Sequence, residues 1–171
     1  DYVGGVVGKV YGTIYRFRVA PSSSGNGAIT IKGLGNYVGG VAGYAYGLIY
    51  SEYSAQTALI YDMKNVSVTA GTTRDDSVEG GNFVGGVAGY AGSDIQTINV
   101  KELSVSSMAN DQGMGFIGGV AGYSSASITE SNALTIRVST SGKADYVGGI
   151  AGLGELLDNV NAEDINVSAK G

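Results

Sequence analysis

The chain has 171 residues, of which 43% are hydrophobic and 15% charged, which argues against disorder and allows one sizeable core. The net charge of −5 argues against nucleic-acid binding, which needs a basic surface. The absence of Cys and His excludes disulfides, Ser-His-Asp and Cys-His triads and most transition-metal sites. No run approaches 18 apolar residues, so no membrane span is predicted.

A Gly-rich phrase recurs five times along the chain. It reads YVGGVVGK from Tyr2, YVGGVAGY from Tyr37, FVGGVAGY from Phe83, FIGGVAGY from Phe116 and YVGGIAGL from Tyr146. Self-similarity at a spacing of about 30–45 residues is typical of repeat proteins, in which each unit packs on its neighbours. The sequence therefore predicts a single repeat domain over residues 1–171, with repeats starting near residues 2, 37, 83, 116 and 146.

Two further segments follow each phrase. The clearer one alternates apolar and polar residues and is rich in Val and Ile, as in AITIKGL from Ala28 and INVKELSV from Ile98, which predicts a strand. The weaker one lies between the phrase and this strand, and each copy contains an early Ile or Leu: Ile14, Ile49, Ile95, Ile128 and Leu156. Three short strands per unit favour a β-solenoid over a propeller, whose blades need four strands. We expect an all-β, triangular β-helix of about five rungs, with one phrase per rung.

The repeated glycines are expected to have structural roles. The first two of each phrase predict a positive φ or a bulge where the chain rounds a corner, and the third is expected to leave space for bulkier residues opposite. In a regular strand, the valine or isoleucine before each glycine pair and the valine or isoleucine after it would point to opposite faces. Both can face the core only if a bulge lies between them. The structural glycines are Gly4, Gly5, Gly8, Gly39, Gly40, Gly43, Gly85, Gly86, Gly89, Gly118, Gly119, Gly122, Gly148, Gly149 and Gly152.

Aromatic residues also recur at fixed places in the phrase. The expected aromatic ladder consists of Tyr2, Tyr37, Phe83, Phe116 and Tyr146 in one column and Tyr44, Tyr90 and Tyr123 in another, with Lys9 and Leu153 at the ends of the second. Structural stacking is the favoured interpretation, and a carbohydrate-binding strip is the alternative. Six other tyrosines belong to no predicted column, and would form a contact patch if exposed: Tyr11, Tyr15, Tyr46, Tyr50, Tyr53 and Tyr61.

Insertions between units are expected to form binding loops, because loops on rigid scaffolds often carry binding residues. They lie at Pro21–Gly27, Ala70–Gly81 and Ser107–Gly115. The candidate contact loop contains Arg74, Asp75, Asp76 and Glu79. Its carboxylates, with Asp111, could bind Ca²⁺ through oxygen ligands, although an ordinary solvated loop is the favoured interpretation and no other cofactor is expected.

The phrase YVGGVAGY, followed by a spaced Ile and a VxV strand, resembles the GLUG repeat of bacterial surface adhesins. The same repeat occurs in the non-catalytic part of immunoglobulin A-cleaving metallopeptidases. The resemblance covers essentially the whole chain and implies an extracellular location on the bacterial cell surface. The HExxH motif of those peptidases is absent, so the resemblance carries over no catalytic residue.

These observations predict a non-enzymatic segment that acts as a rigid stalk or adhesion module. Its first residue is Asp1, and we interpret the chain as a mature piece of a longer exported protein. One alternative is a subunit of a filament built by head-to-tail stacking, and others are a carbohydrate-binding or ice-binding solenoid and, last, a polysaccharide-degrading enzyme. The expected partners are neighbouring repeats or other copies, and a host glycan or protein.

Overall fold

The Gly-rich phrase forms two short strands each time it occurs, separated by its glycine pair. The computed structural model describes residues 1–22, 27–51, 61–74, 77–79, 81–108 and 115–169. The first strands are β1 (Tyr2–Gly4), β5 (Tyr37–Gly39), β11 (Phe83–Gly85), β15 (Phe116–Gly118) and β18 (Tyr146–Gly148). The second strands are β2 (Val7–Val10), β6 (Ala42–Ala45) and β12 (Ala88–Ala91), together with the first parts of β16 (Ala121–Thr129) and β19 (Ala151–Asp158).

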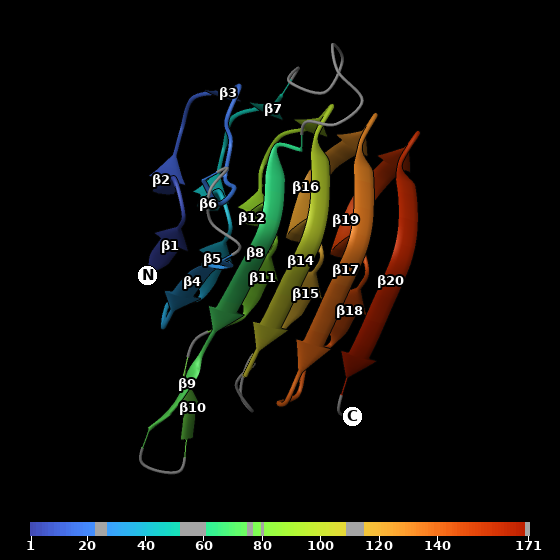
Figure 1. The fold of residues 1–171 in the computed structure, drawn as a ribbon. Coiled ribbons are helices and arrows are strands. Elements are labelled where there is room, and N and C mark those ends of the chain that lie inside the picture. The colour runs from blue at the N-terminus through green and yellow to red at the C-terminus, as the bar shows by residue number, and fades with distance from the viewer. Residues whose placement is uncertain (23–26, 52–60, 75–76, 80, 109–114, 170–171) are drawn as a thin grey trace.

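The two segments after each phrase are also strands, as their alternating pattern predicts. The weaker segment forms β3 (Ile14–Tyr15), β7 (Ile49–Tyr50) and β13 (Ile95–Gln96), and in later turns merges into β16 and β19. The clearer segment forms β4 (Ile29–Gly33), β8 (Met63–Ala70), β14 (Asn99–Ser107), β17 (Asn132–Thr140) and β20 (Asn161–Ala169). An antiparallel hairpin of β9 (Thr72–Arg74) and β10 (Ser77–Glu79) projects beyond the end of β8 (Figure 1).

Parallel sheets wind into a β-solenoid of about four turns (Figure 1). One sheet has the order β1-β5-β11-β15-β18, and the opposite wall has the order β20-β17-β14-β8-β4. The described residues contain no helix, and hence none long and apolar enough to cross a membrane. The predictions of an all-β fold and of a solenoid are therefore confirmed.

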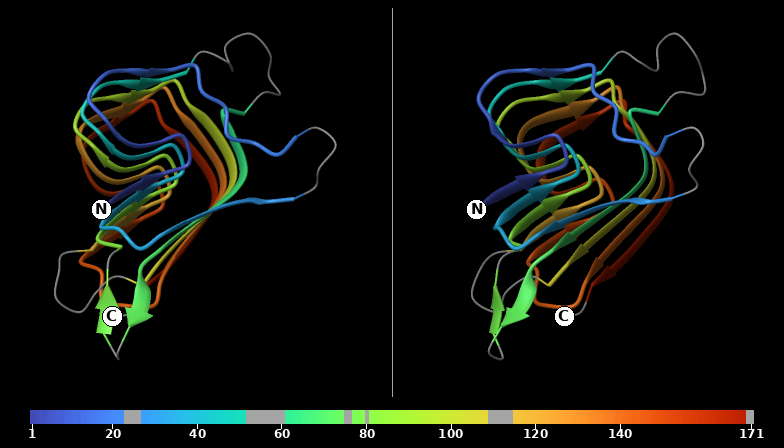
Figure 2. Two further views of the ribbon diagram at one scale, coloured as in Figure 1. Left: turned by 90° about the vertical axis from the view of Figure 1, so that its left-hand side faces the viewer. Right: turned by 60° about the vertical axis from the view of Figure 1, so that its left-hand side comes forward.

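Equivalent residues of successive turns lie one above the other. Tyr37 pairs with Tyr2 on one side and with Phe83 on the other, and Phe116 pairs with Phe83 and Tyr146. The turns repeat one outline, in which the chain reverses sharply between the two strands of the phrase (Figure 2). This reversal folds the outline inward, so it departs from the simple triangle expected from three strands.

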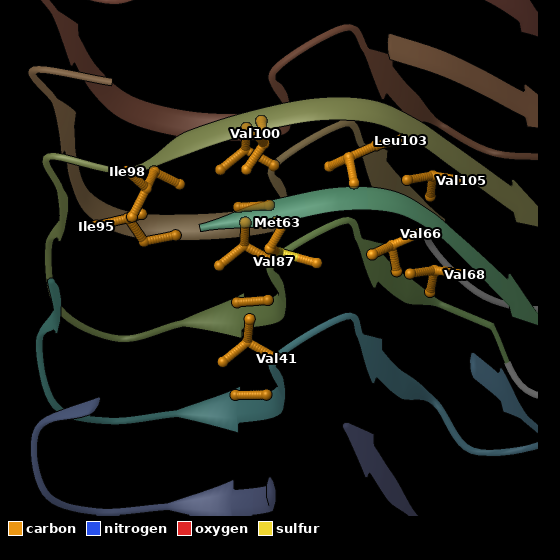
Figure 3. Close-up of a cluster of buried hydrophobic side chains, with 14 of the residues drawn as sticks. Val41, Met63, Val66, Val68, Val87, Ile95, Ile98, Val100, Leu103 and Val105 are labelled. Carbon is orange, nitrogen blue, oxygen red and sulfur yellow. The ribbon is translucent and has the colours of Figure 1, made fainter. Parts of the chain in front are cut away.

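The core lies between the phrase and the opposite wall. Both valine columns of the phrase are buried in the central turns, as predicted: Val38, Val41, Val84, Val87, Ile117 and Val120. From the opposite wall, Val66 and Val68 of β8 lie beside Leu103 and Val105 of β14, and all four are buried (Figure 3). Columns of aliphatic residues form the core, because each buried side chain lies above the equivalent residue of the next turn.

The glycine pair contains the irregularity that brings both valine columns inward. The N–H groups of Val41 and Ala42 both donate to the carbonyl oxygen of Val87, at 2.9 and 3.0 Å. The same sharing recurs in the neighbouring turns, with one carbonyl accepting two successive N–H groups. Of the two conformations predicted for the glycine pair, a bulge or a positive φ, the structure therefore adopts the bulge. A positive φ at the pair is wrong, because the positive-φ glycines of the described chain are Gly71 and Gly81.

Close packing of the backbone explains why the phrase needs glycine. A Cβ on Gly39 would lie 2.0 Å from the Ala42 carbonyl oxygen, and one on Gly40 would lie 2.4 Å from Cε of Met63 in the opposite wall. At the third position, a Cβ on Gly43 would lie 2.8 Å from the carbonyl oxygen of Tyr37. The expectation that this third column leaves space for bulky side chains is wrong, since backbone occupies that space.

Two corners of the outline use a left-handed backbone at residues other than glycine in most turns. One column of such residues is Arg16, Thr97, Glu130 and Asn159, and the other is Asn65, Glu102, Thr135 and Asp164, with φ values of 50–56°. The second column lies within long strands and bends them. Leu156 was expected in the Ile128 column, but Leu157 pairs with Ile128 because a register shift precedes it.

Candidate functional site

The first aromatic column forms a continuous stack along the solenoid. The ring centroids of Tyr2 and Tyr37 are 5.0 Å apart, and those of Tyr37 and Phe83 are 4.8 Å apart. Phe116 continues the stack at 4.9 Å from Phe83 and 5.0 Å from Tyr146. All these pairs are close to parallel, because their strands pair in register. The rings line the outside of the sheet, since the valine that follows each of them points into the core.

The second aromatic column lies directly beside the first. Tyr90 stacks on Tyr44 at 4.3 Å and on Tyr123 at 5.0 Å. The two columns meet edge to face, for example Tyr37 with Tyr44 at 5.2 Å and Phe116 with Tyr123 at 5.5 Å. Edge-to-face and offset-stacked contacts are the favourable geometries for aromatic rings. The sequence-predicted ladder residues therefore lie together in one interlocked aromatic surface.

Two more tyrosine pairs extend this surface in the first two turns. Tyr11 stacks on Tyr46 at 4.9 Å, and Tyr15 stacks on Tyr50 at 5.5 Å. Tyr46 also contacts Tyr44 of the second column at 4.6 Å. The prediction that these four tyrosines belong to no column is wrong, because each pair is a column two residues high. Of the other two, Tyr61 lies near the Lys101 ammonium, and Tyr53 lies outside the described residues.

Lys9 replaces the tyrosine of the second column in the first turn. Its ammonium lies 4.9 Å from the ring centroid of Tyr2, 5.0 Å from Tyr11, 5.6 Å from Tyr44 and 5.4 Å from Tyr46. A hydrogen bond with Tyr11 raises the pKa of Lys9 above its ordinary value. Partial burial and hydrogen bonds with Tyr46 and Tyr90 raise the pKa of Tyr44. The site is therefore a cationic centre surrounded by neutral phenol rings.

Exposure differs along the aromatic surface. Phe116, in a central turn, is only 5% exposed, whereas Tyr11 is 71%, Tyr15 is 52% and Tyr46 is 46% exposed. In later turns the positions equivalent to Tyr15 and Tyr50 are Gln96, Thr129 and Asp158. The fold therefore does not require an aromatic ring at this position. We define the tyrosine patch as Tyr11, Tyr15, Tyr46 and Tyr50, together with Lys9. The patch offers flat apolar faces with hydroxyl groups at their edges, and the positive charge of Lys9 lies beside Tyr11 and Tyr46.

The candidate contact loop lies on the projecting hairpin. Arg74 is the last residue of β9 and pairs with Ser77, and Glu79 of β10 pairs with Thr72. Asp75, Asp76 and Asp111 lie outside the described residues, so the prediction of a Ca²⁺ site stays a prediction. Among the residues that the structure describes, no group of three acidic side chains could hold a metal ion.

A buried carboxyl group that the sequence did not single out lies at the start of the opposite wall. Asp62 and Ser51 are both fully buried, and Ser51 Oγ donates to Asp62 Oδ1 at 2.5 Å. The backbone N–H of Asn99 donates to Asp62 Oδ2 at 2.7 Å. In the next turn Asn132 Nδ2 donates to Asn99 Oδ1 at 2.5 Å, so Asp62 begins a column of stacked polar side chains. The Asn that begins each of β14, β17 and β20 was the signal for this column.

Burial raises the pKa of Asp62 above its ordinary value, although hydrogen bonds from Ser51 and the Asn99 backbone oppose the shift. Both carboxylate oxygens accept hydrogen bonds, and Ser51 and Asp62 are both fully buried. This arrangement stabilises the corner and does not resemble a nucleophilic site.

Two shallow hollows lie on the outer face of the opposite wall, each about 300 Å³ in volume. One is lined mainly by hydroxyl side chains at the ends of β8, β14 and β17, including Thr69, Ser106 and Ser139. The other contains one carboxylate, Glu102, near Arg137. Neither hollow presents the pair of carboxylates that glycoside hydrolysis ordinarily needs.

Comparison with protein-family models, curated proteins and solved structures finds no match to this chain. Its function must therefore be argued from its own residues. Of the sites considered, the tyrosine patch is the one whose exposed side chains exceed what the fold itself requires.

Proposed function

We propose that the chain is a non-enzymatic structural and adhesive repeat segment of an exported bacterial surface protein. In this proposal its five rungs each carry one Gly-rich phrase, as the resemblance to the GLUG repeat implies. Parallel stacking in register supports the role of a rigid stalk, because turns can be added without disturbing the others. The five-stranded order β1-β5-β11-β15-β18 supports the rung count.

The observation that carries the adhesive role is the exposure of the tyrosine patch. Four tyrosines, stacked in two columns, lie on the first two turns; Tyr11 is 71% exposed, and Tyr11 and Tyr46 lie beside Lys9. Aromatic faces with hydroxyl groups at their rims suit the apolar faces and hydroxyl groups of a pyranose ring. The Lys9 ammonium, which lies within 5.6 Å of four rings, favours a sugar that carries a carboxylate. The proposed ligand is therefore an acidic glycan.

Binding to immobilised acidic and neutral polysaccharides tests this proposal. The double variant Tyr11→Ala and Tyr46→Ala should bind the acidic glycan about tenfold more weakly, since each ring contact contributes about 0.5–1.5 kcal/mol. The control is Leu34→Ala, which removes a side chain that is 68% exposed and distant in sequence from the patch. Unchanged binding by the double variant, or equal binding of neutral and acidic glycans, would contradict the proposed site.

Head-to-tail self-association is the second candidate function. It is favoured by the two ends of the solenoid, where the outermost described strands have a partner on one side only. Strand edges of this kind expose backbone N–H and C=O groups that pair readily with another strand.

A further inference from the structure

The charges of the chain are sorted between the two ends of the solenoid. Residues 2–51, which form the first turn and part of the second, include four basic residues and no Asp or Glu: Lys9, Arg16, Arg18 and Lys32. Residues 144–169, which form the last turn, include five acidic residues and no Lys or Arg: Asp145, Glu155, Asp158, Glu163 and Asp164. One end of the solenoid is therefore mainly basic, with Asp1 before it, and the other mainly acidic, with Lys143 before it and Lys170 after it.

Both ends also expose apolar side chains beside unpaired strand edges. At the acidic end Leu156 is 51% exposed and Leu157 is 49% exposed, whereas Ile128, one turn inside, is fully buried. At the basic end Val6 is 55% exposed, whereas Val41 below it is fully buried. The side chains that form the core columns are thus uncovered at both ends, and another turn in the same register would cover them.

The strand pairing within the chain fixes where such a turn would lie. Asp158 lies in the column that runs through Thr129, Gln96 and Tyr50 to Tyr15. The guanidinium of Arg16 lies 4.9 Å from the centre of the Tyr15 ring. A last turn stacked on a first turn therefore brings Asp158 against Tyr15 and the neighbouring Arg16.

Glu163 is placed in the same way. Its Oε1 accepts a hydrogen bond from Asn161 Nδ2 at 3.1 Å, so its carboxylate reaches toward the Asn161 column. That column continues through Asn132 and Asn99 to Asp62, and the bridge between Val19 and Met63 places Arg18 next. Stacking in register thus brings Glu163 toward Arg18.

Glu155 completes the pattern. The residue before it, Gly154, lies in the column of Ser124, Ala91, Ala45 and Val10, and Glu155 follows at the register shift between Ser124 and Ser127, so it lies at the corner that Tyr11 occupies in the first turn. The Lys9 ammonium lies 5.0 Å from the centre of the Tyr11 ring. Three acidic residues of the last turn therefore fall beside three basic residues of the first.

We propose that a second copy of this chain docks head to tail, with its first turn on the last turn of the copy before it and in the register of the internal turns. The facing charges are Glu155 with Lys9, Asp158 with Arg16, and Glu163 with Arg18. This docking rests on the self-association proposed above, and it shares Lys9 with the tyrosine patch. The two docking faces differ, so the contact is heterologous and growth is open-ended. The uncovered apolar columns supply the burial, and the charges select the register.

Two charge-reversed variants test this register. One changes Asp158 and Glu163 to Lys; Lys64 and Lys101 already occupy the Glu163 column, and the Asp158 side chain is exposed. The other changes Arg16 and Arg18 to Glu, and Glu130 already occupies the Arg16 corner with the same positive φ. A control changes Lys64 and Arg137, which are exposed on central strands, to Glu. Sedimentation and light scattering measure mass against concentration, and circular dichroism checks folding.

The wild type and the control should gain mass with concentration, whereas each charge-reversed variant alone should stay monomeric. An equimolar mixture of the two variants should regain the growth, because the reversed last turn of one meets the reversed first turn of the other. If each variant alone gains mass at the same concentration as the wild type, the proposed register is wrong, although self-association itself still stands. If the wild type stays monomeric at low salt, both the register and self-association are wrong. The end faces would then be covered by a neighbouring turn of a longer chain.

Discussion

A Cβ on Gly86 would lie 2.1 Å from the carbonyl oxygen of Gly119, one turn away. The same hypothetical atom would lie 2.7 Å from Cδ1 of Leu103 in the opposite wall. The phrase is thus confined between the next turn and the far side of the core. The glycine pair sets the thickness of the solenoid at this point.

The first prediction follows from this confinement. Gly86→Ala should destabilise the fold by about 3 kcal/mol, since backbone atoms on one side and a packed side chain on the other must move. Gly12→Ala is the matched control, because a Cβ there would have no heavy atom within 4 Å. It should change the free energy of unfolding by less than about 0.5 kcal/mol. Urea denaturation measures both, and equal stability of the two variants would contradict the close packing.

The repeated phrase was enough to predict much of this fold. Because Tyr37, Phe83 and their equivalents recur at the same place, their pairing in register and the burial of Val38 and Val41 could be inferred before any coordinates. The bulge at the glycine pair could be inferred as well, since a regular strand could not bury both valines.

Other features could not be predicted, for identifiable physical reasons. The left-handed corner residues Thr135 and Glu102 share no side-chain type, so the conformation is imposed by the neighbouring turns. Tyr11 and Tyr46 form a column only two residues high, which a search for five-fold recurrence overlooks. Asp62 was overlooked because the next three members of its column are asparagines and the member before it is Arg18.

The second prediction concerns the aromatic columns. Phe83 stacks at 4.8 Å on Tyr37 and at 4.9 Å on Phe116, and contacts Tyr90 edge to face at 6.0 Å. Phe83→Ala should therefore lower the free energy of unfolding by about 2–3 kcal/mol, somewhat less than for a fully buried ring. Tyr11→Ala, at an exposed end of the surface, should cost less than about 1 kcal/mol. A larger loss at Tyr11 than at Phe83 would show that the end of the solenoid, and not its middle, depends on stacking.

The third prediction concerns a strained corner. Thr135 has a φ of 55°, a conformation that a β-branched residue adopts at a cost of about 1–2 kcal/mol. Thr135→Gly should raise the free energy of unfolding by about 0.5 kcal/mol, because relief of strain exceeds the added freedom of the unfolded chain. Thr30→Gly, in the interior of β4, should instead lower it by about 0.5–1 kcal/mol. Thermal unfolding of the two variants distinguishes the cases, and a loss of stability in both would contradict the strain.

The last prediction concerns pH and Asp62. Burial raises the pKa of its carboxyl in the folded protein above the ordinary value of 3.8. Between that value and the raised pKa, the folded state therefore binds more protons than the unfolded chain does. The contribution of Asp62 to stability consequently falls as the pH rises through this window, and recovers as the pH falls.

Asp62→Asn isolates this contribution, because an amide can replace the carboxyl without a charge. Asn occupies the same column at Asn99 and Asn132, and its Nδ2 can donate to Ser51 while its Oδ1 accepts from the Asn99 backbone. The variant should therefore gain stability relative to wild type as the pH rises from 4 to 7, as measured by urea denaturation at each pH. Asp145→Asn, an exposed change at the far end of the solenoid, should leave the wild-type pH dependence in place. If the difference between Asp62→Asn and wild type is the same at pH 4 and pH 7, the pKa of Asp62 is not raised in the fold.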